Sequence, residues 1–185
     1  MSILEVRTFG DPVLFSVADE VKKFDGKLKT LIADMVETMV EVEGVGLAAP
    51  QVGVGLRLFT YHVDGEIGHV INPKLEVDNN ELQYEHEGCL SAPSLSYATP
   101  RPKFSKVTGF NQDGNEIEVS GAGLMARVLQ HECDHLDGKL FISRLEKDNR
   151  KDAMQKLRKG VYDAKSNVIK RQRSNAVSSS FFKGA

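Results

Sequence analysis

The first hydrophobic pattern in the chain has the period of an α-helix. Its apolar positions fall three or four residues apart, at Leu28, Leu31, Ile32, Met35, Val36 and Met39. Asp25 precedes the pattern as an N-cap, and Gly44 follows it as a terminator. The spacing predicts an amphipathic helix that runs from Asp25 to about Glu43 and turns its apolar side toward the core.

The middle of the chain favours β-strands. Runs of β-branched and aromatic residues are separated by Asp64-Gly65 and Asp113-Gly114, two pairs that are typical of hairpin turns. The strands predicted from these runs cover residues 56–63, 69–77, 81–86, 103–110 and 116–119.

Two further helices are predicted. One begins between residues 121 and 124 and continues to Leu136, and a charged one covers about 145–170. Strands that lie between helices without regular β-α-β alternation indicate the α+β class. We expect small antiparallel or mixed sheets around the central helix, with a C-terminal helix. A single domain is expected over residues 1–170, followed by a flexible tail over 171–185.

Composition indicates a compartment. The chain has 185 residues, of which 41% are hydrophobic and 27% are charged, as in soluble globular proteins. No apolar run approaches the roughly 18 residues of a membrane helix, and the first residues lack the pattern of a secretory signal. The two cysteines, Cys89 and Cys133, are too few for the disulfide framework of a secreted domain. We therefore expect a cytoplasmic protein with no membrane partner, whose cysteines are free thiols or metal ligands.

The net charge is −2, but it is unevenly distributed. From Arg144 to the end there are 12 Lys and Arg against 4 Asp and Glu, a net charge of +8. Residues 1–143 therefore carry 12 against 22, a net charge of −10. A basic C-terminal region is typical of segments that bind polyanions such as RNA. It is equally typical of a solvated terminal helix, and both alternatives stay open.

The predicted central helix contains the sequence His131-Glu132-Cys133-Asp134-His135. At about 100° per residue, the two histidines share one helix face, as two ligands of one metal ion must. Glu132 lies at the edge of that face, where its carboxylate can reach a water molecule, whereas Cys133 points away. The alternative is a helix whose two histidines are exposed or cap the core.

A catalytic ion of this kind needs a third protein ligand. Upstream, Cys89 lies in the segment Glu87-Gly88-Cys89-Leu90-Ser91, although an isolated cysteine is more often a small buried apolar residue. The downstream acidic candidates, which would suit a general metalloprotease, are Glu146, Asp148, Asp152 and Asp163.

A segment of small residues, 44–51, follows the first predicted helix. Its sequence, Gly-Val-Gly-Leu-Ala-Ala-Pro-Gln, leaves the backbone open to the close approach of a substrate. Gln51 adds an amide donor that can face a developing negative charge. A tight turn would have the same composition, so the segment alone does not establish a site.

Taken together, these segments resemble the peptide deformylase family. The three parts of that family's signature occur here complete and in order, at residues 44–51, 87–91 and 130–135. The resemblance extends from Asp11 to Phe141. It implies an enzyme that removes the formyl group from N-formylmethionine at the start of new polypeptides and releases formate.

The resemblance also implies roles for individual residues. Glu132 would act as general base and then as general acid. Gln51 and the backbone N–H of Leu90 would form the oxyanion hole. The ion is typically Fe²⁺ in this family, with Zn²⁺, Ni²⁺ or Co²⁺ as replacements, and its ligands here would be Cys89, His131 and His135.

Substrate-binding and supporting residues are assigned by position. The methionine pocket is expected to be lined by Gly44, Val45, Leu90, Val128 and Leu129, although Val128 and Leu129 suit the core equally well. Val45 and Gly46 would pair their backbone with the peptide. Glu87 is also expected to bind substrate. In addition, Arg101 is expected to pair with both Glu87 and Asp134 and so to support the metal ligands.

Two features concern contacts beyond methionine. Many bacterial members have a basic or Gln-rich run after the Cys motif that contacts the peptide, whereas this chain has Ser94-Leu95-Ser96-Tyr97-Ala98. A basic C-terminal helix can dock bacterial members on the ribosome near the nascent-chain exit, and the +8 region is compatible with docking. The non-enzymatic alternative is a module that binds RNA and contains a structural metal ion. That function would leave Glu132 and Gln51 without a role.

Overall fold

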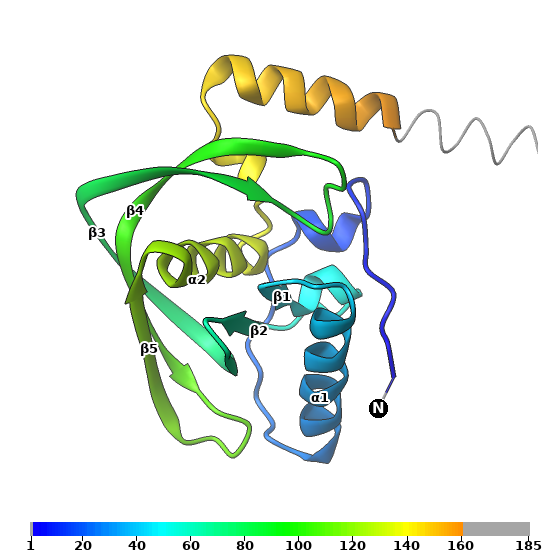
Figure 1. The fold of residues 1–185 in the computed structure, drawn as a ribbon. Coiled ribbons are helices and arrows are strands. Elements are labelled where there is room, and N and C mark those ends of the chain that lie inside the picture. Colours follow the sequence, from blue (N-terminus) through cyan, green and yellow to red (C-terminus); the bar gives the residue numbers. More distant parts are fainter. Residues whose placement is uncertain (1, 161–185) are drawn as a thin grey trace, which may run out of the picture.

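Residues 2–160 are described by a computed structural model, in which one antiparallel sheet curves around a central helix (Figure 1). The sheet has the order β1-β2-β3-β4-β5, formed by β1 Gly46–Ala48, β2 Leu58–Val63, β3 Glu66–Gly88, β4 Ser96–Phe110 and β5 Glu116–Ala122. The α-helices are α1 Gly26–Glu41, α2 Gly123–Leu136 and a C-terminal helical segment over 147–160. Short 3₁₀ turns occur at η1 Pro12–Phe15, η2 Ala49–Val52 and η3 Phe141–Arg144. The predicted α+β class is confirmed.

The first predicted helix is present as α1. The Asp25 carboxylate accepts hydrogen bonds from the backbone N–H groups of Lys27 and Leu28, so the expected N-cap is confirmed. The helix ends at Glu41, and Glu43 has a left-handed backbone conformation with φ 53° that redirects the chain toward β1. The buried apolar side chains of the helix are Leu28, Ile32, Met35 and Met39.

The main difference from the predicted elements lies in β3. The strands predicted over 69–77 and 81–86 belong to this single strand, which has an irregular register between Asp78 and Leu82. Residues 78–80 lie between the two predicted strands and were assigned to neither, but pairing with β4 on both sides of the irregularity keeps the chain extended.

Strand β4 starts seven residues earlier than predicted, because Pro100 and Pro102 do not interrupt it. Proline cannot donate a ladder hydrogen bond and is therefore tolerated where one strand edge has no partner. β5 pairs with β4 only from Phe104 onward, so that edge of β4 is open at both prolines.

Helix α2 lies inside the curve of the sheet and contacts all five strands. Its apolar side joins the main core cluster, in which Leu129, Cys133 and Leu136 meet Phe59 and Val107. The opposite side of the same helix carries the motif histidines. The core therefore holds α2 at a fixed position against the sheet. The side of α2 that carries the histidines faces the segments that follow α1 and β3.

The C-terminal helical segment, residues 147–160, packs through Ala153 and Leu157 on a cluster that includes Ala92 and Leu95. The predicted continuation of this helix to residue 170, the domain end there and the tail over 171–185 lie outside the described residues. In the described part of the chain, no helix is long and apolar enough to cross a membrane.

Candidate metal centre and active site

Three side chains that are far apart in the sequence converge beside α2. Cys89 follows the last residue of β3, and His131 and His135 lie one turn apart on α2. One ligand atom from each of the three lies within 4.8 Å of the others, and Cys89 Sγ is 3.3 Å from His135 Nε2. Cys133 lies on the other side of the helix in the core, as the helical spacing predicted.

The chemistry around these three residues fits a divalent metal ion. His131 Nδ1 contacts Glu87 Oε2 at 3.1 Å, which orients the ring and leaves its other nitrogen for an ion. Burial raises the pKa of the Cys89 thiol, but the neighbouring His135 and His131 lower it well below its usual value, so the thiolate is favoured. A Cys-His-His donor set with one side open to a cavity is typical of catalytic ions with three protein ligands.

The downstream acidic residues do not join this cluster. Among the described residues, the group with metal-ligand geometry is Cys89 with the two histidines, and it includes neither Glu146 nor Asp148. Asp152 instead accepts a hydrogen bond from the Tyr97 hydroxyl and pairs with a lysine one turn later. Asp163 lies outside the described residues. The geometry therefore favours the cysteine over an acidic third ligand.

Glu132 lies next to this cluster and faces β1. Its side chain is only 3% exposed, and its Oε2 has no hydrogen-bond partner among the described residues. Burial raises the pKa of this carboxyl above its usual value. A Cβ atom at Gly46 would clash with the Glu132 carboxylate, so the glycine is required for the close approach of β1 to α2.

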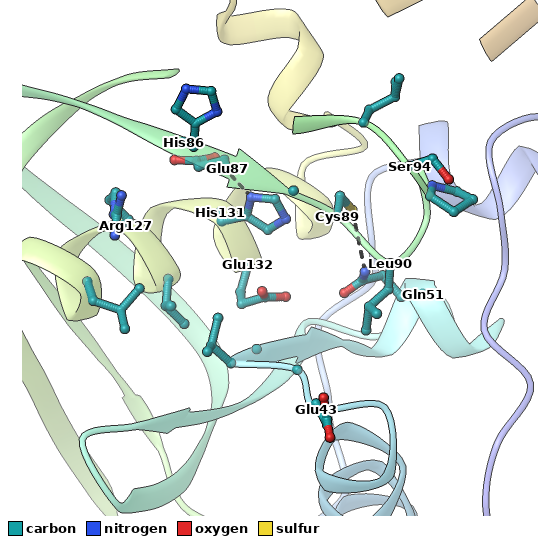
Figure 2. A pocket seen from close by; sticks show the side chains of 18 residues that line it. Glu43, Gln51, His86, Glu87, Cys89, Leu90, Ser94, Arg127, His131 and Glu132 are labelled. Carbon is teal, nitrogen blue, oxygen red and sulfur yellow. Dashed lines mark hydrogen bonds and ion pairs between the residues drawn. The ribbon is translucent and has the colours of Figure 1, made fainter. Parts of the chain in front are cut away.

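Gln51 and Leu90 lie on the side of Cys89 that faces Glu132 (Figure 2). The Gln51 Oε1 atom accepts a hydrogen bond from the Ala48 N–H at 2.8 Å, which fixes the direction of the amide. Its Nε2 atom makes only long contacts, at 3.7 Å to Cys89 Sγ and 3.4 Å to Ser91 Oγ. The amide N–H groups are therefore available to a ligand beside the cluster.

A cavity of about 520 Å³ opens next to these groups. Seven of the residues that were expected to bind substrate or form the oxyanion hole line it. They are Gly44, Val45, Gly46, Gln51, Glu87, Leu90 and Val128. Leu129 does not line it and its expected place in the pocket is wrong, because its side chain is fully buried in the main core cluster. Leu129 is therefore a core residue, which was the alternative given for it in the sequence analysis.

Other lining residues were missed by sequence reasoning. Leu124 and Arg127 lie seven and four residues before His131 on α2, so helical spacing alone places them on the same face. Glu43, His86 and Pro93 come from loops and a strand end, and nothing local in the sequence marks them, whereas Ser94 and Leu95 belong to the run after the Cys motif that the sequence analysis named.

Comparison with known proteins gives the same assignment. A family model described as polypeptide deformylase matches residues 3–151. The chain belongs to this family. A peptide deformylase of Acidothermus cellulolyticus is 48% identical over 170 residues, which cover 92% of this chain and 94% of the relative. The chain is a hydrolase that removes the N-terminal formyl group of nascent formyl-methionyl peptides.

Solved deformylase structures share the fold. The peptide deformylase of Legionella pneumophila is similar with a TM-score of 0.79 and 39% identity, covering 86% of this chain and 96% of that chain. The enzyme of Thermotoga maritima is similar with a TM-score of 0.76 and 44% identity, covering 78% of this chain and 99% of that chain. These likenesses place the curved sheet and α2 of this chain in the deformylase fold.

A buried arginine supports the ligands in this deformylase. Arg101 on β4 is 2% exposed and donates from Nε and Nη2 to the two carboxylate oxygens of Glu87, at 2.9 and 3.0 Å. Its Nη1 donates to Asp134 at 2.5 Å, and Arg144 also pairs with Asp134. Burial alone would raise the pKa of Glu87, but hydrogen bonds from His131 and Arg101 lower it below its usual value. Arg101 lies where the sequence expectation placed it, whereas Arg144 was missed.

Proposed function

We propose that Cys89, His131 and His135 hold one divalent ion in this chain, and that Glu132 moves the protons of formyl-group hydrolysis. The observation that carries the proposal is the convergence of the three ligand atoms within 4.8 Å beside the buried carboxylate of Glu132, whose Oε2 has no partner among the described residues. A structural metal site would need neither that carboxylate nor an adjoining cavity.

The ion is Fe²⁺ in this proposal, with Zn²⁺, Ni²⁺ or Co²⁺ as functional replacements. One soft thiolate and two imidazoles suit several borderline metals, so availability as well as affinity selects among them. When bound, such an ion lowers the pKa of water and polarises the formyl carbonyl.

Glu132 is the general base and then the general acid. Its carboxylate accepts the proton of the attacking water, and its raised pKa lets it keep that proton until the amine leaves. It then gives the proton to the leaving amine, which yields formate and a free N-terminus. Gln51 Nε2 and the backbone N–H of Leu90 donate to the formyl oxygen as negative charge develops there.

The peptide lies in the cavity along the open edge of β1. The N–H of His62 donates to the Val45 carbonyl, so the next residue, Gly46, directs its own N–H and C=O away from β2. Among the strands that the structure describes, β1 has β2 as its only neighbour, which leaves its other edge open to an extended peptide. The methionine side chain fits the apolar wall formed by Gly44, Val45, Leu90 and Val128.

The test is formate release from a formyl-Met tripeptide by protein that is purified anaerobically and loaded with Fe²⁺, Ni²⁺ or Zn²⁺. Glu132→Ala should lower kcat by about 10²- to 10⁴-fold with metal content unchanged. Cys89→Ala should lose the ion, whereas the matched Cys133→Ala should retain it. Absence of formate with every ion, despite bound metal, would refute the assignment of the chemistry to these residues.

We also propose a cytoplasmic, single-domain enzyme that reaches nascent chains by docking on the ribosome through its basic C-terminal region. Support comes from the charge of residues 144–160, which contain seven Lys and Arg against three Asp and Glu. Cosedimentation with ribosomes should be lost steeply as salt rises, since docking to RNA is largely electrostatic. Binding that is independent of salt would refute this mode of docking.

A further inference from the structure

An arginine without a partner forms part of the cavity wall. Arg127 is the only Lys or Arg among the described residues that line the cavity. None of its nitrogen atoms forms an ion pair or hydrogen bond with a described residue, and its Nε atom is buried. Buried donors are nearly always paired in folded proteins, so the unpaired Nε of this half-buried side chain beside a binding cavity points to an acidic group on the ligand.

The position of Arg127 indicates which part of the peptide it meets. It lies one turn before His131 on α2, a rise of about 6 Å along the helix axis. Figure 2 shows it on the far side of His131 from Cys89 and Gln51, away from the reacting centre. An extended peptide advances about 3.3 Å per residue, so this distance corresponds to roughly two residues.

Neither Glu87 nor Glu43, two carboxylates that line the cavity, pairs with Arg127. The Glu87 carboxylate is already paired with Arg101 and His131. Glu43 is exposed and lies at the end of α1, well separated from Arg127 in Figure 2. The cavity therefore presents one cationic position on the α2 side for a ligand carboxylate.

We propose that Arg127 is a specificity-determining residue that binds an Asp or Glu side chain at one of the two positions after formylmethionine. The proposal rests on the proposed function, since it assumes that formylated peptides occupy this cavity. In this proposal α2 recognises the peptide beyond methionine. The Ser94–Ala98 run after the cysteine motif has no charged residue that could do so.

The test compares kcat/KM for C-terminally amidated formyl-Met-Asp-Ala and formyl-Met-Ala-Asp with the same peptides containing Asn. For at least one pair we expect the Asp peptide to be preferred about fivefold, chiefly through KM, and the preference to weaken with salt. Arg127→Gln should bring the ratio to about one, and Arg127→Glu should favour Lys over Asn at the same position. Arg158→Gln, at an exposed position of the C-terminal helical segment, is the matched control and should keep the ratio.

Three outcomes would overturn the proposal: equal rates for Asp and Asn peptides in the wild type, a preference that survives Arg127→Gln, or one that appears only with a free C-terminal carboxylate. Arg127→Lys should retain part of the preference, which separates loss of charge from loss of folding. Formate release from the neutral peptide keeps the two proposals distinct. Without it the proposed function fails, whereas release without an Asp preference refutes the role of Arg127 alone.

Discussion

Replacement of Arg101 by leucine tests the support behind the metal ligands most directly. The change removes three charge-assisted hydrogen bonds and leaves the Glu87 and Asp134 carboxylates buried, with exposed fractions of 7% and 3%. Glu87 then retains only its contact to His131, and Asp134 retains Arg144. Loss of one member of a buried ion pair costs about 3–5 kcal/mol because the remaining charge is left uncompensated.

The expected result is a loss of about 4 kcal/mol in the free energy of unfolding, or about 10 °C in Tm for a chain of this size. Urea unfolding at one fixed metal concentration measures it, since bound metal contributes to stability. Arg57→Leu is the matched control, because Arg57 pairs with Asp137 near the surface and its loss should cost about 1 kcal/mol.

A second substitution separates charge from lost side-chain contacts. Adding Glu87→Gln to Arg101→Leu removes one uncompensated charge and should restore at least about 1 kcal/mol. A loss below about 1 kcal/mol for Arg101→Leu, or no recovery in the double variant, would refute the reasoning. Metal content of the variants, measured in parallel, should fall because the orientation of His131 depends on Glu87.

Three further predictions concern separate parts of the molecule. Gly46→Ala places a Cβ atom against the Glu132 carboxylate and should lower kcat about 10²-fold, whereas Gly26→Ala, which meets nothing within 4 Å, should leave kcat unchanged in the same assay. Tyr97→Phe removes the hydroxyl that hydrogen-bonds to Asp152 and Lys156 of the C-terminal helical segment and should speed hydrogen exchange over 147–160, by a destabilisation of about 1 kcal/mol; unchanged exchange would contradict it. Metal content after dialysis should fall as the pH is lowered, because Cys89 binds as a thiolate and protons compete with the ion. Elemental analysis measures this content, and a content that stays constant with pH would contradict the prediction.

The sequence by itself determined the features that depend on local periodicity. The helical spacing predicted α1 and its Asp25 cap, and it placed His131 and His135 on one face of α2 with Cys133 on the other. These relations follow from helix geometry and hold wherever the helix lies. The same spacing also puts Arg127 on the face of the histidines, although the residue was not among those predicted from the sequence.

The tertiary structure decided everything that depends on pairing between distant segments. It joined two predicted strands into β3, because pairing with β4 outweighed the polar run between them. It brought Cys89 to the histidines and Gly46 against Glu132, contacts that bridge more than 40 residues. Local sequence cannot specify such contacts, since they arise only when the sheet curves around α2 and a shared core fixes the distance between them.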